Sequence, residues 1–192
     1  MKRFIHITVL LIAIAGTSSA QTAWTLDKSH SSVTFSIRHM MISDVEGSFK
    51  EFDIVFASDK EDFTDATIAA TIKTTSINTD NERRDGHLKS DDFFNAEKYP
   101  AITFQSKKFE KVSDTNYKIR GDLTIREVTK PVVFDAVFGG AVKGQRGVMA
   151  GWKATLVLNR FDFNLKWDRT IETGGLVAGK DVTITVNAEV RK

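Results

Sequence analysis

The 192-residue sequence contains no cysteine. This absence excludes disulfide bonds, thiol nucleophiles and lipid attachment through an N-terminal cysteine. A protein without such crosslinks must be held together by its hydrophobic core, which a single domain of this length can supply.

Histidine is also scarce, and its positions do not suit a shared metal ion. After residue 20 the chain has only His30, His39 and His87. None of them has the spacing of a histidine-pair motif, and His30 and His39 lie near opposite ends of one predicted strand. We therefore expect no metal site.

Two other common site motifs, the P-loop and the serine nucleophile elbow, are incomplete or absent in this sequence. The segment from Gly174 to Asp181 is close to a P-loop, but Asp181 stands where a Ser or Thr would hold magnesium. A predicted strand also follows this segment where a P-loop requires a helix, so we expect a hairpin loop. The sequence has no Gly-x-Ser-x-Gly elbow for a serine nucleophile.

Long apolar runs are confined to the N-terminus. Lys2 and Arg3 precede an apolar stretch at 4–16, and small residues at 18–20 form a cleavage-site pattern. This pattern predicts a secretory signal peptide at 1–20 and a single domain over 21–192, exported to the periplasm. A membrane anchor at the N-terminus is the alternative. No later run approaches the roughly 20 apolar residues of a membrane span, so we expect no stable membrane insertion.

An excess of positive charge is missing from the predicted mature chain. The full sequence has 27 Lys and Arg against 25 Asp and Glu, and residues 1–20 hold Lys2 and Arg3 but no acid, which leaves 25 of each. Nucleic-acid binding requires clustered basic residues, so we expect no nucleic-acid partner.

What the sequence does have is a regular series of about eight segments in which apolar and polar residues alternate, as in one-faced strands. A change of phase between Phe49 and Phe52 predicts a bulge near Lys50 and Glu51. The segments run approximately over 33–37, 52–56, 68–72, 102–104, 117–125, 132–138, 148–158 and 182–188.

These segments favour an all-β fold, either a sandwich or a closed barrel. Several reach ten residues or more, which is long for a sandwich and favours an extended, antiparallel eight-stranded barrel. Small inward-facing residues such as Ala70, Ala136 and Ala154 suit a barrel whose lumen is not filled by side chains. A packed core that alternates large and small residues is the alternative.

The segment from Thr79 to Ser106 breaks the alternation and predicts a short helical lid. Thr79 and Glu82 have the spacing of a capping box, and Ser90 offers a second helix start. Phe93 and Phe94 would form the aromatic underside of this lid.

The segment at 159–167 also interrupts the strand pattern, with two Phe, a Trp and one Arg. Arg160 would either anchor the polar head of a ligand at the barrel rim or cap nearby carbonyls in a packed loop.

Several motifs follow one another along the chain, at residues 24–31 (Trp-Thr-Leu-Asp-Lys-Ser-His-Ser), 84–88 (Arg-Asp-Gly-His-Leu), 121–125 (Gly-Asp-Leu-Thr-Ile) and 159–163. In this order they resemble the motifs of the YceI family. The resemblance implies a lipocalin-like barrel that holds a polyisoprenoid or similar amphiphile, in a family in which some relatives form homodimers. Two residues depart from the family pattern, because Glu127 and Asn164 each stand where glycine is usual.

The resulting hypothesis is a periplasmic, non-enzymatic protein that carries or sequesters a polyisoprenoid, either an isoprenoid quinone or a polyprenyl phosphate, or a similar long-chain lipid. No other cofactor is expected. Phe93 and Phe94 would close the lid end, and Arg84, His87 or Arg160 would meet the polar head. The predicted wall consists of Phe35, Phe56, Ile68, Ile72, Phe104, Phe134, Phe138, Trp152 and Leu156.

Two alternatives stay open. An exported enzyme could modify a lipid or quinone by using His87 with Asp85 or Asp92 as acid and base. A stress-related envelope protein could instead use the outside of its barrel as a docking surface.

Overall fold

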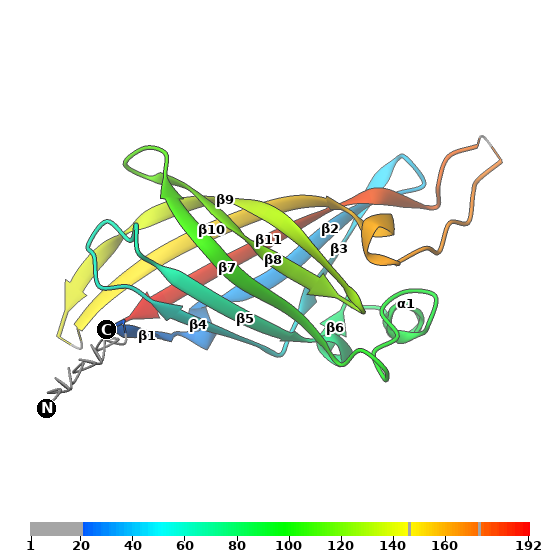
Figure 1. Ribbon diagram of the computed structural model, residues 1–192. Helices are drawn as coiled ribbons and strands as arrows, with labels where there is room; N and C mark the ends of the chain where they lie inside the picture. The colour runs from blue at the N-terminus through cyan, green and yellow to red at the C-terminus, as the bar shows by residue number, and fades with distance from the viewer. Residues whose placement is uncertain (1–20, 146, 173) are drawn as a thin grey trace, which may run out of the picture.

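The computed structural model describes residues 21–145, 147–172 and 174–192 as an elongated barrel of long, tilted strands (Figure 1). A short helix, α1 (Glu82–Lys89), lies at the end of the barrel opposite the C-terminus. The strands are β1 (Ala23–Leu26), β2 (Ser32–His39), β3 (Ser43–Phe49), β4 (Phe52–Ala57), β5 (Thr67–Lys73), β6 (Ile77–Asn78), β7 (Ala101–Lys111), β8 (Asn116–Ile125), β9 (Val128–Gly144), β10 (Gly147–Asn159) and β11 (Ala178–Arg191). Three 3₁₀ turns complete the set: η1 (Lys28–His30), η2 (Thr74–Ser76) and η3 (Arg160–Phe163).

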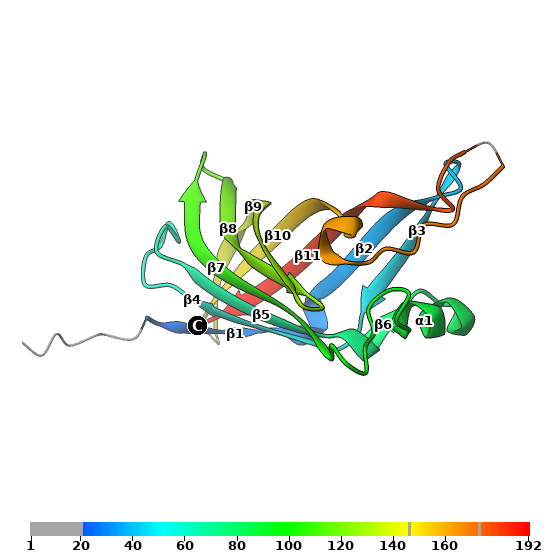
Figure 2. The same ribbon diagram turned by 45° about the vertical axis from the view of Figure 1, so that its right-hand side comes forward.

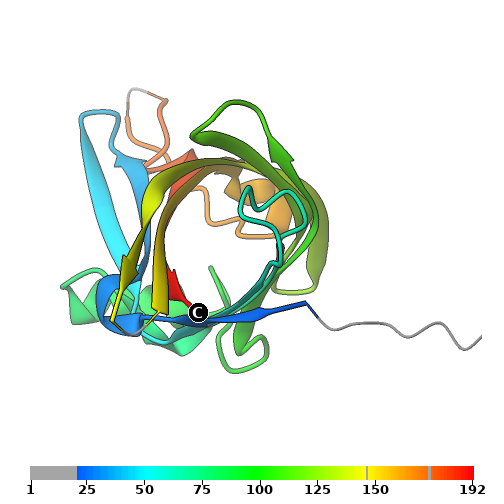
Figure 3. The same cartoon turned by 90° about the vertical axis from the view of Figure 1, so that its left-hand side faces the viewer.

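Eight strands close an antiparallel barrel, which confirms the predicted fold class. The order around the barrel is β1-β4-β5-β7-β8-β9-β10-β11, and β1 closes it by pairing with β4 through its first residues and with β11 through its last. The end-on view in Figure 3 shows the closed ring of strands. β2, β3 and β6 continue the sheet from β11 on the side of α1.

The inward and outward residues follow from the alternation in the sequence, since successive side chains of a strand point to opposite faces. On β11, the even-numbered residues Val182, Ile184 and Val186 face inward, and Thr183 and Thr185 face outward. Near Lys50 and Glu51, where the sequence predicts a bulge, the structure has a short break: β3 ends at Phe49 and β4 begins at Phe52.

The lid helix is shorter than the sequence indicates. The capping-box prediction is wrong, because the N-cap is Asn81, whose side chain accepts a hydrogen bond from the backbone N–H of Arg84 at 3.0 Å. Ser90 is the C-cap of α1 and starts no second helix. The chain that follows α1 forms turns (Figure 2). Phe93 and Phe94 lie in these turns and not in a helix.

The predicted signal peptide at 1–20 lies outside the described residues. Within the described part of the chain, no helix has both the length and the apolar character that a membrane crossing requires.

Candidate functional site

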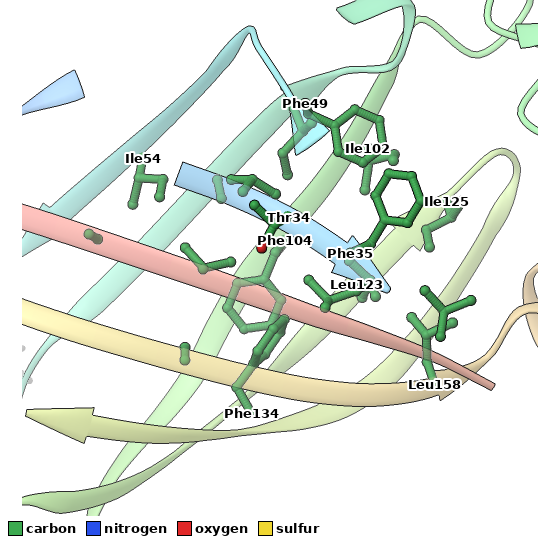
Figure 4. Close-up of a pocket in the computed structure, with 18 of the residues that line it drawn as sticks. Thr34, Phe35, Phe49, Ile54, Ile102, Phe104, Leu123, Ile125, Phe134 and Leu158 are labelled. Atoms are coloured by element: carbon green, nitrogen blue, oxygen red, sulfur yellow. The ribbon is translucent and has the colours of Figure 1, made fainter. Parts of the chain in front are cut away.

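A cavity of about 180 Å³ lies inside the barrel. Its wall is built almost entirely from apolar side chains that alternate along the strands. Figure 4 labels several of them, including the facing pair Phe104 and Phe134, whose ring centroids are 5.2 Å apart. Among the described lining residues, polar side-chain atoms come from Thr34, Trp152 and Arg160. An interior normally fills such space with its own side chains, so this cavity is suited to a long apolar guest.

Aromatic rings close the cavity at the end of the barrel that holds the two described termini. Phe56, Phe109 and Trp152 line the cavity there. Behind them lie further rings that do not line it, and the centroid of Trp152 is 5.2 Å from Phe63 and 4.8 Å from Phe138. The cavity therefore ends at a floor of rings, which we call the aromatic floor: Phe56, Phe63, Phe109, Tyr117, Phe138 and Trp152.

At the opposite end, α1 and the turns that follow it cover the cavity. Leu88, Phe93 and Phe94 all line the cavity, as the predicted lid requires. Arg126 fastens this segment: its Nη1 donates to the carbonyl of Phe93 at 3.0 Å, and its Nη2 donates to Oδ1 of Asp91 at 2.9 Å.

Arg160 supplies the one charge that reaches the cavity wall among the described lining residues. It is 2% exposed, and its guanidinium donates to the carbonyls of Gly179 at 2.8 Å, Leu165 at 2.6 Å and Ala178 at 3.0 Å. Burial lowers the pKa of Arg160 while Asp168 opposes that shift, and an arginine stays protonated at neutral pH. Arg160 caps carbonyls, as one of the two sequence interpretations predicts, and it also borders the lid end of the cavity. The anchoring of a ligand head stays a prediction.

Most of the predicted ligand-binding residues line the cavity. They are Phe35, Phe56, Ile68, Ile72, Phe93, Phe94, Phe104, Phe134, Trp152 and Arg160. Phe138 and Leu156 have the expected inward phase, but Phe138 lies behind Trp152, and Leu156 belongs to the buried core without reaching the cavity wall.

Arg84 and His87 do not line the cavity. Arg84 donates from Nε to Oγ1 of Thr79 at 2.8 Å, and Asp85 accepts from the same hydroxyl at 2.5 Å. Asp85 is thus turned toward Thr79, whereas Asp92 is the acid that His87 contacts, with Nε2 and Oδ2 2.7 Å apart. The ring of His87 also lies 5.1 Å from that of Phe93, so it supports the lid from outside.

Sequence reasoning missed Phe63 and Arg126. Phe63 is 3% exposed although it sits in a loop between charged residues, and its isolated apolar character was the available signal. Arg126 gave no local signal, because all of its hydrogen-bond partners come from other segments.

Fold and cavity together define the class of protein: a closed antiparallel barrel around an apolar lumen. A YceI-like domain model matches residues 24–190. A UPF0312 protein of Staphylococcus aureus is 41% identical over 170 residues, which cover 88% of this chain and 96% of the relative. The chain belongs to the YceI-like domain family.

Solved structures agree with this assignment. The crystal structure of the Campylobacter jejuni YCEI protein is 38% identical with a TM-score of 0.71, and the match covers 88% of this chain and 96% of that one. A polyisoprenoid binding domain from Saccharophagus degradans shares the fold with a TM-score of 0.64 at 13% identity, over 90% of this chain and 99% of that one.

Proposed function

We propose that this protein is a periplasmic lipid-binding protein that carries or sequesters a polyisoprenoid or a similar long-chain amphiphile in its barrel. The observation that supports this most is the apolar cavity, which is covered by a lid at one end and by the aromatic floor at the other. The polyisoprenoid binding domain of Saccharophagus degradans has the same fold, which adds support. Periplasmic location rests on the signal-peptide pattern at 1–20.

Binding would be driven by burial of the apolar chain, which contributes about 25 cal/mol for each Å² removed from water. The wall offers few polar atoms, so directional contacts would be few. Arg160 borders the lid end, and three of its five N–H donors are bonded to carbonyls. The polar head of the amphiphile, a quinone or a phosphate, would lie near this guanidinium.

One observation favours the enzymatic alternative, namely the contact of 2.7 Å between His87 and Asp92. Both side chains lie outside the cavity wall, so a bound lipid would have to present its head above the lid to reach them. Turnover of a lipid or quinone that His87→Ala abolishes while binding is retained would establish this activity.

Filling the cavity from its own wall tests the proposed function. Ala154 lines the cavity on β10, and Val157 on the same strand is 63% exposed on the outside. Native mass spectrometry with a polyprenol should show binding by the wild type and by Val157→Trp, and at least about tenfold weaker binding by folded Ala154→Trp, because the added indole takes the volume of the guest. Equal binding by both variants would place the lipid outside the barrel.

A further inference from the structure

The aromatic floor has two layers that differ in their relation to the cavity. Phe56, Phe109 and Trp152 line the cavity, whereas Phe63 and Tyr117 lie behind them. Trp152 contacts rings of both layers, since its ring centroid is 5.3 Å from Phe109, 5.2 Å from Phe63 and 5.0 Å from Tyr117. The floor is therefore a stack of rings and not a single side chain that can swing aside.

Phe63 reaches this stack from a loop, unlike the other five rings, which lie on strands. Its backbone is left-handed, with φ of 55°, an uncommon conformation for a bulky residue. The loop is fastened on both sides of Phe63, because Tyr117 donates from its hydroxyl to the carbonyl of Asp62 at 3.1 Å, and Ser58 donates to Oδ1 of Asp65 at 2.7 Å. In Figure 3 the segment between β4 and β5 leans over this end of the barrel.

The two ends of the cavity differ in polarity. Arg160 brings a charge to the lid end, and the floor end presents apolar surface, apart from the indole N–H of Trp152, which is buried and has no acceptor among the described residues. An amphiphile would keep its head near Arg160 and direct its hydrocarbon chain toward Trp152. The far end of the chain would then meet the floor.

We infer that Trp152, backed by Phe63, sets the longest hydrocarbon chain that the barrel accepts. This inference rests on the proposed lipid-binding function and adds a specificity-determining residue to it. A chain that fits gains burial along its whole length, but any part beyond the floor must fold back or stay in water and gains nothing. Because Trp152 is held by ring packing without a hydrogen bond, phenylalanine at this position would keep most of the floor, whereas alanine would open an apolar space of the kind that takes up apolar guests.

The test is the distribution of chain lengths that the full-length mature protein selects from an equimolar mixture of farnesol, geranylgeraniol and longer polyprenols, read by native mass spectrometry. The wild type should show an optimum length. Trp152→Ala should move that optimum toward longer chains by about one isoprene unit, and Trp152→Phe should leave it near the wild-type value. Ile184→Ala is the matched control, because it widens the middle of the cavity wall without lengthening the cavity and should leave the optimum in place.

Phe63→Leu is a second test of the inference, and it changes no residue that lines the cavity. By loosening the support of Trp152 it should broaden the distribution toward longer chains, and it keeps the inference testable if Trp152→Ala does not fold. An unchanged optimum in folded, lipid-binding Trp152→Ala or Phe63→Leu would overturn the inference, as would an equal shift in Ile184→Ala. Failure of the wild type to bind any member of the mixture would refute the lipid-binding function itself.

Discussion

Asn164 donates a hydrogen bond of 2.7 Å from its Nδ2 to Oε1 of Glu127, which joins the end of η3 to the turn between β8 and β9. These are the two residues that depart from the YceI-family pattern, and the structure shows that they contact each other beside the lid. The two departures therefore lie at the same rim of the barrel and stabilise one contact there.

The backbone at Asn164 predicts unequal effects for two substitutions. Asn164 is left-handed, with φ of 61° and ψ of 22°, a conformation that asparagine and glycine tolerate better than alanine. Asn164→Ala should lower the free energy of unfolding by about 1–2 kcal/mol, since it loses the hydrogen bond and gains backbone strain. Asn164→Gly should cost less, because relief of strain offsets the lost bond. Urea denaturation measures both, and equal losses would mean that the backbone conformation is irrelevant.

The same contact predicts a dependence on pH. The hydrogen bonds from Asn164 and then Tyr99 lower the pKa of Glu127 below its ordinary value of 4.5. A lowered pKa in the folded state means that the stabilisation is fully present above 4.5 and is lost as the pH falls through the folded value. The difference in unfolding free energy between wild type and Glu127→Gln should therefore shrink as the pH drops below 4.5, whereas a constant difference would show that the ionised form is not the one stabilised.

Replacement of Arg160 by lysine should destabilise the fold, although both side chains carry a positive charge. The planar guanidinium of Arg160 reaches three carbonyls that a lysine ammonium cannot serve in the same geometry. We expect Arg160→Lys to lower the free energy of unfolding by about 2–3 kcal/mol, because buried carbonyls lose charge-assisted partners. Lys166→Arg, at an exposed position nearby in sequence, is the control and should change stability little. If Lys166→Arg lowered the free energy of unfolding by a similar amount, the effect would come from local disruption of the chain and not from the lost carbonyl contacts.

Gly47 should be needed for the shape of the cavity. A Cβ at this position would collide with the ring of Phe35, which lines the cavity. Gly47→Ala should push that ring into the lumen, weaken polyprenol binding several-fold and destabilise the fold by about 1–3 kcal/mol. Gly86→Ala, where nothing lies within 4 Å of the added methyl group, is the matched control. Unaltered binding by folded Gly47→Ala would mean that Phe35 does not bound the occupied space.

The sequence predicted the barrel because each strand buries one face. Each strand's own residues therefore alternate between apolar and polar. Sequence reasoning missed β1 and β6, since β1 has four residues and β6 only two, too few for a periodic pattern. It also missed β3, in which only Val45 and Phe49 are apolar. β1 nevertheless closes the barrel, and its role comes from pairing with distant strands.

The cavity wall was predictable for the same reason, and its exceptions have tertiary causes. Phe138 has the correct phase, but it is the direct partner of Trp152 on the neighbouring strand, and the indole lies 4.8 Å from its ring and separates it from the cavity. The capping box at Thr79 failed because Arg84 and Asp85 bind its hydroxyl and Asn81 is the N-cap of the helix. Phe63 and Arg126 could not be assigned because most of their partners are far away in the sequence.

The most direct measurement is organic extraction of the protein purified under native conditions, followed by mass spectrometry of the extract. The proposed function predicts one dominant long-chain amphiphile in near-stoichiometric amount, and a marked loss of it from Ala154→Trp but not from Val157→Trp. An extract without lipid, from a protein that also fails to take up added polyprenol, would contradict the account.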